Sequence, residues 1–271
     1  MATRFSTLAE LTEHHDATIP DRVAIRVGDD VWRWRDFHDR VLRAVAMLRA
    51  LGVKPGDRVG WLALNHPDFV TLMCACFRLR AVLVAINARL VAREIAYILG
   101  DAGIDLLVSE TGFLDLVEEA RAATGLGTVI LLDAPRQGRP PLAELMLAHA
   151  PDADMPAISP DDVALQLYTS GTTGFPKGAL LTHRQLLGTT EKGQLTGEAW
   201  GRWTADDVSL VAMPLFHIGG TGWALHAMEA GAAMVILPRP DVPGMVAAIQ
   251  RERITRCLLY TSPSPRDRQK S

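Results

Sequence analysis

Short apolar runs alternate along the chain with longer segments in which apolar side chains recur every three or four positions. The short runs are typical of buried strands, and the longer segments are typical of amphipathic helices. Strands that are almost continuously apolar and alternate with helices predict a largely parallel α/β sheet with helices on both faces. In the first half we expect helices over 36–51, 67–79, 91–102 and 113–123, and strands over 58–64, 81–85, 106–109 and 128–132.

The regions outside this alternation are simpler. Residues 22–27 and 31–34 are β-prone, and the turn sequence Gly28-Asp29-Asp30 between them predicts a hairpin. His14 and His15 fall in an expected N-terminal helix, and we interpret both as surface residues. Either Asn65 or His66 is placed to cap the helix that begins at Pro67. Residues 133–159 are expected to be a surface connection with one short helix over 142–148.

The second half continues the same alternation. Thr182 is the expected N-cap of a helix over 182–195, and Pro214–Gly220 is the expected turn into a helix that ends near Glu229. A further helix is expected over 242–253. The expected strands are 163–168, 208–213, 232–237 and 254–259.

Composition and charge exclude several classes of function. The 271 residues are 48% hydrophobic and 22% charged, as in an ordinary globular protein. A net charge of −3 gives no basic surface for nucleic acid. Prolines and glycines interrupt the longest uncharged stretch, 208–228, so we expect no membrane span. Peripheral association with a membrane and the oligomeric state are left open.

The three cysteines are too few and too irregularly spaced for a zinc site or a disulfide framework. We interpret Cys74, Cys76 and Cys257 as buried free thiols in a reducing compartment. Residues 1–20 contain no apolar core of a secretory signal. These observations predict a cytoplasmic protein.

The strongest chemical signal is the segment 169–178, Thr-Ser-Gly-Thr-Thr-Gly-Phe-Pro-Lys-Gly, which we call the candidate phosphate loop. Its three glycines let the backbone approach a ligand closely, and its hydroxyls and Lys177 supply donors and a positive charge. Successive backbone N–H groups in such a turn bind anions. The spacing differs from the Walker pattern, because Pro176 stands where the second glycine belongs and Gly178 follows the lysine. We therefore expect a nucleotide polyphosphate site of another kind.

The segment 168–178 resembles the phosphate-loop signature of the adenylate-forming (AMP-binding) superfamily, which includes acyl- and aryl-CoA synthetases, luciferases and peptide-synthetase adenylation domains. The segments 86–99 and 214–217 are also similar to family motifs, although proline often stands at the position of Ala88. The resemblance implies that His217 lines the substrate entrance; a structural histidine at a strand end is the alternative. It also implies that ATP phosphates are held by Thr169, Ser170, Gly171, Thr172, Thr173, Gly174 and Lys177.

The same resemblance indicates the class of substrate. Adenylation domains for amino acids usually carry an aspartate near 216–218, and this chain has none. Burying an α-ammonium without a counter-charge costs several kcal/mol, so an amino acid is disfavoured. The side chains of Phe216, Ile218, Trp223 and Leu225 favour a fatty or other apolar acid, and core packing explains them equally well.

By resemblance, we expect an acid–thiol ligase that uses ATP, Mg²⁺ and coenzyme A to convert a carboxylic acid to an acyl-adenylate and then to a thioester. No catalytic residue is assigned, and the metal ligands are unknown. One alternative is a ligase of the same superfamily that does not use coenzyme A, such as an acyl-AMP ligase or a luciferase-like enzyme. Another is a truncated domain that binds ligand without catalysis.

The family's later motifs, which carry its magnesium glutamate, ribose aspartate and catalytic lysine, are not found in residues 178–271. We interpret 1–257 as a partial N-terminal domain, without the C-terminal small domain and inactive alone. Its first subdomain is 1–160, and a second begins over 161–257. Residues 262–271 are polar and broken by prolines, and we interpret 258–271 as a disordered, non-native tail.

Two other groups of residues invite a functional reading. The carboxylate pairs Asp161-Asp162 and Asp206-Asp207 each precede an expected strand, so turn roles are favoured over acid–base or metal chemistry. Without a basic surface, the tryptophans are better explained by packing than by base stacking; they are Trp32, Trp34, Trp200 and Trp203.

Overall fold

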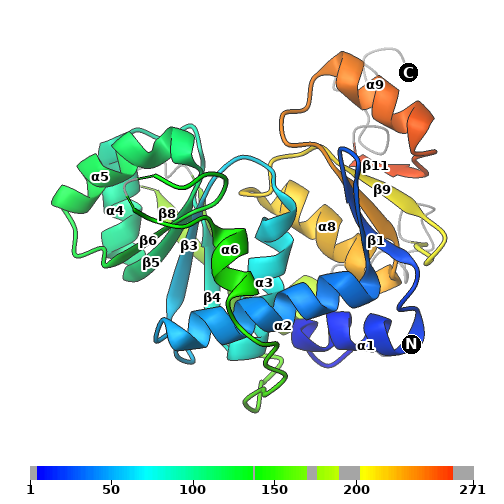
Figure 1. The fold of residues 1–271 in the computed structure, drawn as a ribbon, viewed down its shortest axis with the longest axis horizontal. Coiled ribbons are helices and arrows are strands. Elements are labelled where there is room, and N and C mark those ends of the chain that lie inside the picture. Colours follow the sequence, from blue (N-terminus) through cyan, green and yellow to red (C-terminus); the bar gives the residue numbers. More distant parts are fainter. Residues whose placement is uncertain (1–4, 137, 170–175, 189–201, 259–271) are drawn as a thin grey trace.

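The computed structural model describes residues 5–136, 138–169, 176–188 and 202–258 (Figure 1). The helices are α1 (Leu11–Thr18), α2 (Trp34–Ala50), α3 (Pro67–Leu79), α4 (Ala92–Ala102), α5 (Leu114–Ala122), α6 (Leu142–Leu147), α8 (Ile218–Ala230) and α9 (Val242–Arg251), with short 3₁₀ turns at Leu8–Glu10 and Thr111–Phe113. The strands are β1 (Val23–Val27), β2 (Asp30–Arg33), β3 (Arg58–Leu62), β4 (Val82–Ala85), β5 (Ile104–Ser109), β6 (Thr128–Leu131), β7 (Val163–Thr169), β8 (Lys177–Thr182), β9 (Val208–Val211), β10 (Ala233–Ile236) and β11 (Arg256–Cys257).

The strands form two sheets. The six-stranded sheet has the order β6-β5-β3-β4-β7-β8 and is parallel except for β8. The five-stranded sheet has the order β11-β9-β10-β1-β2 and is parallel except for β2. Helices α4 and α5 cover one face of the six-stranded sheet, and α3 lies on the other (Figure 1). Helices α8 and α9 pack on opposite faces of the five-stranded sheet. This confirms the predicted fold class of mostly parallel sheets flanked by helices.

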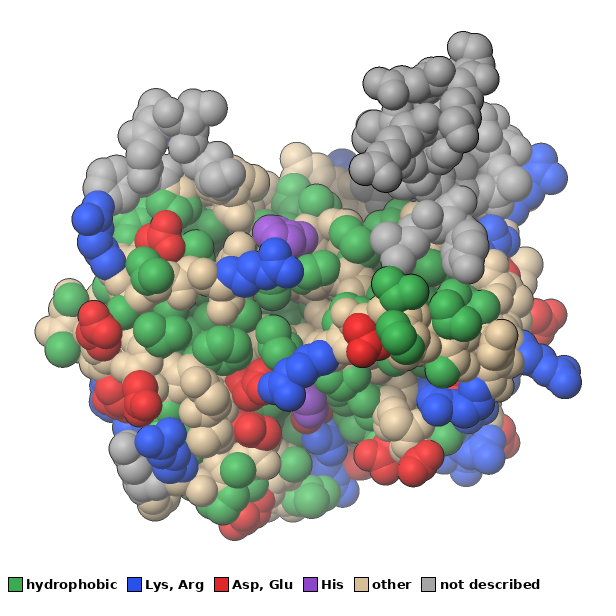
Figure 2. Space-filling view, turned by 90° about the horizontal axis from the view of Figure 1, so that it is seen from above, with side chains coloured by type: hydrophobic (Ala, Val, Ile, Leu, Met, Phe, Trp, Pro, Cys, Tyr) green, Lys and Arg blue, Asp and Glu red, His purple; other side chains and the backbone are tan. Residues whose placement is uncertain are grey.

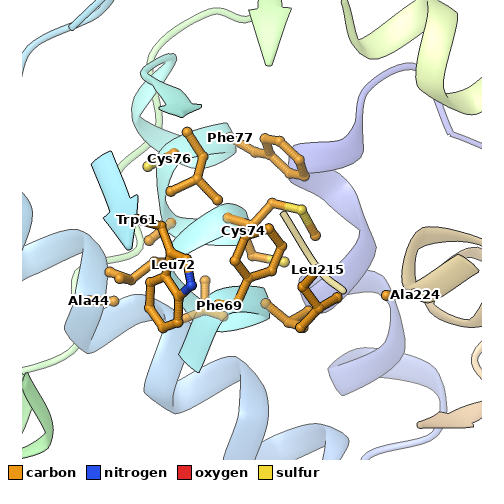
Figure 3. Close-up of a cluster of buried hydrophobic side chains, with 14 of the residues drawn as sticks. Ala44, Trp61, Phe69, Leu72, Cys74, Cys76, Phe77, Leu215 and Ala224 are labelled. Atoms are coloured by element: carbon orange, nitrogen blue, oxygen red, sulfur yellow. The ribbon is translucent and has the colours of Figure 1, made fainter. Parts of the chain in front are cut away.

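Helix α3 lies in the core that the two sheets share, and all of its residues are buried. Its side chains pack against Ala44 of α2 and Trp61 of β3, and on the other side against Leu215 and Ala224 near α8 (Figure 3). Burying a large apolar side chain completely contributes about 1.5–3 kcal/mol. The helix therefore joins both sheets into one hydrophobic core.

Most predicted elements are confirmed within a few residues, including the hairpin of β1 and β2, where Gly28 takes a positive φ of 58°. Strand β8 was not predicted. It lies at the sheet edge, and its exposed positions do not alternate, so it lacks the apolar pattern of a buried strand. The expected helix after it begins at His183, with Thr182 as its N-cap: the Gln185 backbone N–H donates to Thr182 Oγ1 at 3.2 Å. The rest of that expected helix, 189–195, lies outside the described residues.

The prediction that His15 is a surface residue was wrong. Its side chain is 1% exposed and its Nε2 lies 2.7 Å from the Met228 carbonyl oxygen at the end of α8. Packing of α1 against α8 buries this ring, and that contact joins segments more than two hundred positions apart. His14, in contrast, is partly exposed.

Neither sheet is confined to one side of residue 160, since β1 and β2 join the five-stranded sheet and β7 and β8 join the six-stranded one. Leu258, the first residue of the predicted tail, packs partly buried against the shared core. Residues 259–271 lie outside the described residues.

Within the described part of the chain, no helix is both long enough and apolar enough to span a bilayer.

We predict that Leu72→Ala, in the middle of α3, lowers the free energy of unfolding by about 2–5 kcal/mol, because it leaves a cavity in the shared core. Leu147→Ala is the matched control, since Leu147 is 66% exposed whereas Leu72 is fully buried. Urea unfolding followed by circular dichroism measures both changes. Equal shifts of the two midpoints would contradict the central place of α3.

Candidate functional site

The candidate phosphate loop joins two antiparallel strands. Strand β7 ends at Thr169, the chain returns at Lys177 in β8, and these two residues are cross-strand partners. Because β7 runs parallel to β3, β4 and β5, the loop lies at the edge formed by the carboxyl ends of these strands. Figure 2 looks onto this edge and shows hydrophobic side chains across its middle with basic and histidine side chains among them. The predicted contacts Ser170, Gly171, Thr172, Thr173 and Gly174 lie outside the described residues.

The base of the loop is fixed by the cross-strand pair Tyr168 and Gly178. A Cβ at Gly178 would lie 2.5 Å from Gln166 Nε2 and 3.1 Å from Tyr168 Cζ, so a larger residue would displace the Gln166 side chain. The Tyr168 hydroxyl donates to Asp101 Oδ2 at 2.5 Å and accepts from Gln166 Nε2 at 3.1 Å. Burial, and then the Asp101 carboxylate, raise the pKa of Tyr168, so the phenol stays protonated. These contacts hold the loop-bearing strand to α4.

The two described ends of the loop are free to meet a ligand. Thr169 and Lys177 are both exposed. Among the described residues, Lys177 has no ion-pair partner, whereas Arg239, at the carboxyl edge of the other sheet, pairs with Glu110. An unpaired ammonium group beside a glycine-rich turn is suited to neutralise a polyphosphate.

His217 lies at the N-terminus of α8, at the end of a tight turn. The His217 backbone N–H donates to the Pro214 carbonyl at 3.1 Å, and the turn requires Gly220, where a Cβ would lie 2.2 Å from that oxygen. The imidazole is exposed and meets the Phe216 ring edge-on, with ring centroids 4.7 Å apart. Its side chain does not cap the helix. The exposed ring is therefore available to a ligand, as the substrate-entrance role requires.

The turn that carries His217 is held by Asn65, which follows β3. Asn65 Nδ2 donates to the Met213 and Leu237 carbonyl oxygens at 3.1 and 3.2 Å, and Asn65 Oδ1 accepts from the Leu215 N–H at 2.8 Å. The helix cap is His66 instead, whose Nδ1 accepts from the Asp68 N–H at 3.1 Å. Asn65 was one of the two expected caps, and the local sequence carries no signal for carbonyl partners that lie 148 and 172 positions away.

A second contact crosses between the sheets at the same edge. Glu110, directly after β5, accepts from the Leu64 N–H at 3.2 Å, and its other oxygen pairs with Arg239 Nη2 at 3.1 Å. Arg239 follows β10 of the five-stranded sheet. The Arg239 side chain is 77% exposed, so this ion pair contributes little to stability. The ion pair does, however, add a second contact between the two sheets beside those made by Asn65.

The paired carboxylates have the turn roles favoured from the sequence. Asp162 accepts from the Ser159 N–H at 2.8 Å and pairs with Arg80, while Asp161 pairs with Arg184. Asp207 accepts from the Thr204 N–H at 2.9 Å and pairs with Arg256. Hydrogen bonds from these partners lower the pKa of Asp162 and Asp207 despite partial burial, which itself raises it. Asp206 pairs with Arg22 on the surface.

The predicted packing role of the described tryptophans is confirmed, and so is the burial of the three cysteines. Trp34 is fully buried, Trp32 and Trp203 pack against the shared core, and Trp200 lies outside the described residues. All three cysteines are buried and free. Burial raises the pKa of the Cys76 thiol to about 12 and that of Cys74 still higher, so neither is a nucleophile. Within the described ranges, no group of three or more acidic, histidine or cysteine side chains is arranged to hold a metal ion.

Residues 12–263 match the AMP-binding enzyme family, and the chain belongs to that family. It is 32% identical over 235 residues to a fatty acid–[acyl-carrier-protein] ligase, ScoC, of Streptomyces coeruleorubidus, covering 86% of this chain and 44% of the relative. It is 35% identical over 237 residues to a feruloyl-CoA synthase of an Amycolatopsis species, covering 87% and 45%. The chain thus spans about half the length of these relatives.

Solved structures agree with this assignment. The inhibitor-bound N-terminal domain of FACL13 from Mycobacterium tuberculosis superposes with a TM-score of 0.82 at 25% identity, covering 97% of this chain and 67% of that one. The fold predicted from the family resemblance is therefore confirmed in a second way.

One buried histidine ties the end of β8 to the N-terminal segment. The Leu8 backbone N–H donates to His183 Nδ1 at 3.3 Å, and the Phe77 ring of α3 packs edge-on against the imidazole. Burial lowers the pKa of His183 from 6.5 to about 4, although the Asp162 carboxylate acts in the opposite direction. The folded protein therefore holds this ring neutral.

We predict that this histidine makes stability depend on pH. The unfolded chain takes up the proton more readily than the folded chain between pH 6.5 and about pH 4, so stability is present above this window and falls as the pH decreases through it. The loss attributable to His183 is about 2 kcal/mol between pH ~7 and pH ~5.

His183→Asn keeps an acceptor near the position of Nδ1 but does not titrate, so it should flatten this part of the dependence. The remainder comes from His38, His66 and His226, whose pKa values burial also lowers. Urea midpoints across the pH range measure the effect, with His217→Asn as the exposed control. A variant that loses stability as steeply as the wild type would contradict the assignment.

Proposed function

We propose that the protein activates a carboxylic acid with ATP, forming an acyl-adenylate and pyrophosphate, and then transfers the acyl group to the thiol of coenzyme A. The observation that carries the proposal is the candidate phosphate loop, which leaves β7 at Thr169 and returns at the exposed Lys177. Membership of the AMP-binding enzyme family and the activities named for the relatives support it.

In the first half-reaction a carboxylate oxygen bonds to the α-phosphorus of ATP, and the bond from that phosphorus to the bridging oxygen breaks. The leaving pyrophosphate carries the developing negative charge. Lys177 and the hydroxyls of the loop neutralise and orient it, together with the backbone N–H groups of Gly171 and Gly174. Catalysis of this kind consists mainly of positioning and charge stabilisation. Thr169, Ser170, Thr172 and Thr173 are the hydroxyl donors in this proposal.

In the second half-reaction the sulfur of coenzyme A bonds to the acyl carbon, the bond to the AMP oxygen breaks, and the thiol proton is released to solvent. ATP, the acid and the thiol are all substrates. Mg²⁺ would neutralise the phosphates when bound. The described residues offer no cluster of ligands for it.

The acid is proposed to be fatty or otherwise apolar, entering beside His217. Its neighbour Ile218 is 52% exposed, which leaves an apolar side chain at the same position of the turn. Trp223 and Leu225 are buried in the core, at 5% and 1% exposure, so packing explains both of them. The relatives named above act on a fatty acid and on ferulate, and both acids have large apolar parts.

The second candidate is transfer of the acyl group to a carrier protein in place of coenzyme A. The observation that favours it is the similarity to a ligase named for an acyl carrier protein. The two proposals share the first half-reaction and the same loop, and they differ only in the thiol acceptor. We further propose a cytoplasmic location, which three buried free thiols support.

We also propose, from the family resemblance, that residues 1–257 form the partial N-terminal domain, with a second subdomain that begins near residue 161 and carries the loop. Residues 258–271 are proposed to be a non-native tail, of which Leu258 packs against the shared core.

Lys177→Met is predicted to lower the rate of acid-dependent ATP–pyrophosphate exchange about 10²–10³-fold, because one positioned group at the developing charge is lost. The assay uses the full-length product of the gene that contains this sequence. Lys54→Met is the matched control, since Lys54 is exposed in a turn at the opposite edge of the six-stranded sheet. Exchange at the wild-type rate in Lys177→Met would remove this lysine from the mechanism.

A labelled substrate tests the class of reaction. An acid that carries heavy oxygen in its carboxylate is predicted to pass one labelled oxygen to AMP, since a carboxylate oxygen bonds to the α-phosphorus and stays there when the thioester forms. Phosphorus NMR of the product AMP detects the label. Label in inorganic phosphate, or AMP without label, would show that the acid is activated in another way.

A further inference from the structure

The Asn65 carboxamide contacts three backbone groups of the other sheet. Its two donor contacts go to the Met213 and Leu237 carbonyls, which follow β9 and β10, and its oxygen receives the Leu215 N–H. The side chain itself belongs to the segment after β3 of the six-stranded sheet. Asn65 is 5% exposed, so water does not take the place of these partners.

Only a carboxamide serves all three partners. An amide has both a donor group and an acceptor oxygen, whereas a carboxylate has acceptors alone and an aliphatic side chain has neither. A buried backbone carbonyl or N–H without a partner is costly, and the carbonyls of Met213 and Leu237, just after β9 and β10, each accept from Asn65. The two carbonyls and the one N–H that face this position therefore require a carboxamide side chain.

Two of the three groups that Asn65 holds, those of Met213 and Leu215, belong to the turn with the exposed His217. Leu215, whose N–H it accepts, is two residues from His217, and Thr221 Oγ1 donates to the Leu215 carbonyl at 2.5 Å in the first turn of α8. Asn65 thus fixes this turn against the edge at which β7 delivers the candidate phosphate loop. The contact links the segment after β3 to the turn that carries His217.

We infer that Asn65 is a positioning residue: its carboxamide sets the placement of the turn 213–217, and with it the acid-binding side of the site, relative to the nucleotide side. The names acid side and nucleotide side rest on the proposed function. The hydrogen bonds of Asn65 do not depend on that proposal. Removing the donor should loosen the acid side first and leave the nucleotide side intact.

The test is Asn65→Asp, which keeps the size and the acceptor but replaces the donor with an oxygen that faces two carbonyls. In the 271-residue chain, amide hydrogen exchange measured by NMR should become about tenfold faster for Leu215 and His217, while amides in β3 and β5 exchange as before. Asn87→Asp is the matched control: Asn87, after β4 at the same edge, only accepts from the nearby Arg89 N–H at 2.9 Å.

The kinetic arm uses the full-length gene product. Asn65→Asp should raise the KM for the acid about tenfold and leave the KM for ATP within about twofold, because only one side of the site moves. Lowering the pH should partly restore the acid KM, because a protonated carboxyl again has a donor for one carbonyl. If the side chain acted only on overall stability, the KM values for the acid and for ATP would change and recover together.

Two results would overturn the inference. One is a uniform rise of exchange across both sheets together with equal changes in the two KM values, which would make Asn65 a general stabiliser. The other is exchange at Leu215 like that of the wild type. If the wild-type protein activates no acid, the proposed function fails, and the exchange measurement alone still decides whether Asn65 positions the turn.

Discussion

Complete burial of helix α3 is the constraint on which the rest of the structure depends. The helix lies between two sheets, and every residue from Pro67 to Leu79 is buried. Its polar ends must therefore find partners inside the protein. His66 caps the first turn, and Asp68, 2% exposed, accepts two hydrogen bonds from Arg40 at 2.6 and 2.8 Å.

Near the other end of α3, the buried Arg78 side chain also has partners inside the protein, although its Nε has none among the described residues. Arg78 is 2% exposed, and its guanidinium donates to the Ala9 and Ala153 carbonyls at 3.4 and 3.1 Å and pairs with Glu13 at 3.2 Å. A buried guanidinium is tolerated only when it is paired and hydrogen-bonded. Satisfying the helix thus fixes the N-terminal segment and the connection after α6 against it, and places Asn65, just before α3, between the two sheets.

Much of the fold follows from the sequence because buried strands and amphipathic helices have distinct periods. Residues 104–109 and 128–131 pair in parallel as their apolar runs predict. Strand β8 could not be predicted this way, since Leu180 is 49% exposed at the sheet edge and pairing, not burial, makes the strand. His15 was placed on the surface because its partner, Met228, is near only in the folded chain.

Some features of the candidate site could likewise be predicted from local sequence, and others could not. The residue order of the loop identified the family, and the match to AMP-binding enzymes confirms it. Local turn chemistry also gave correct roles for Asp162 and Asp207. The contacts of Asn65 and the pair of Glu110 with Arg239 depend on long-range geometry, which no local pattern reveals.

The most direct test of the account is an NMR titration of the chain with ATP. If the nucleotide binds at the carboxyl edge, backbone amide shifts should move and saturate at Thr169, Lys177 and Gly178. They should stay constant at the opposite edge, where Arg58 and Arg80 line a cavity of about 300 Å³. Saturable shifts centred on that cavity, with none at the ends of the loop, would contradict the assignment of the nucleotide site.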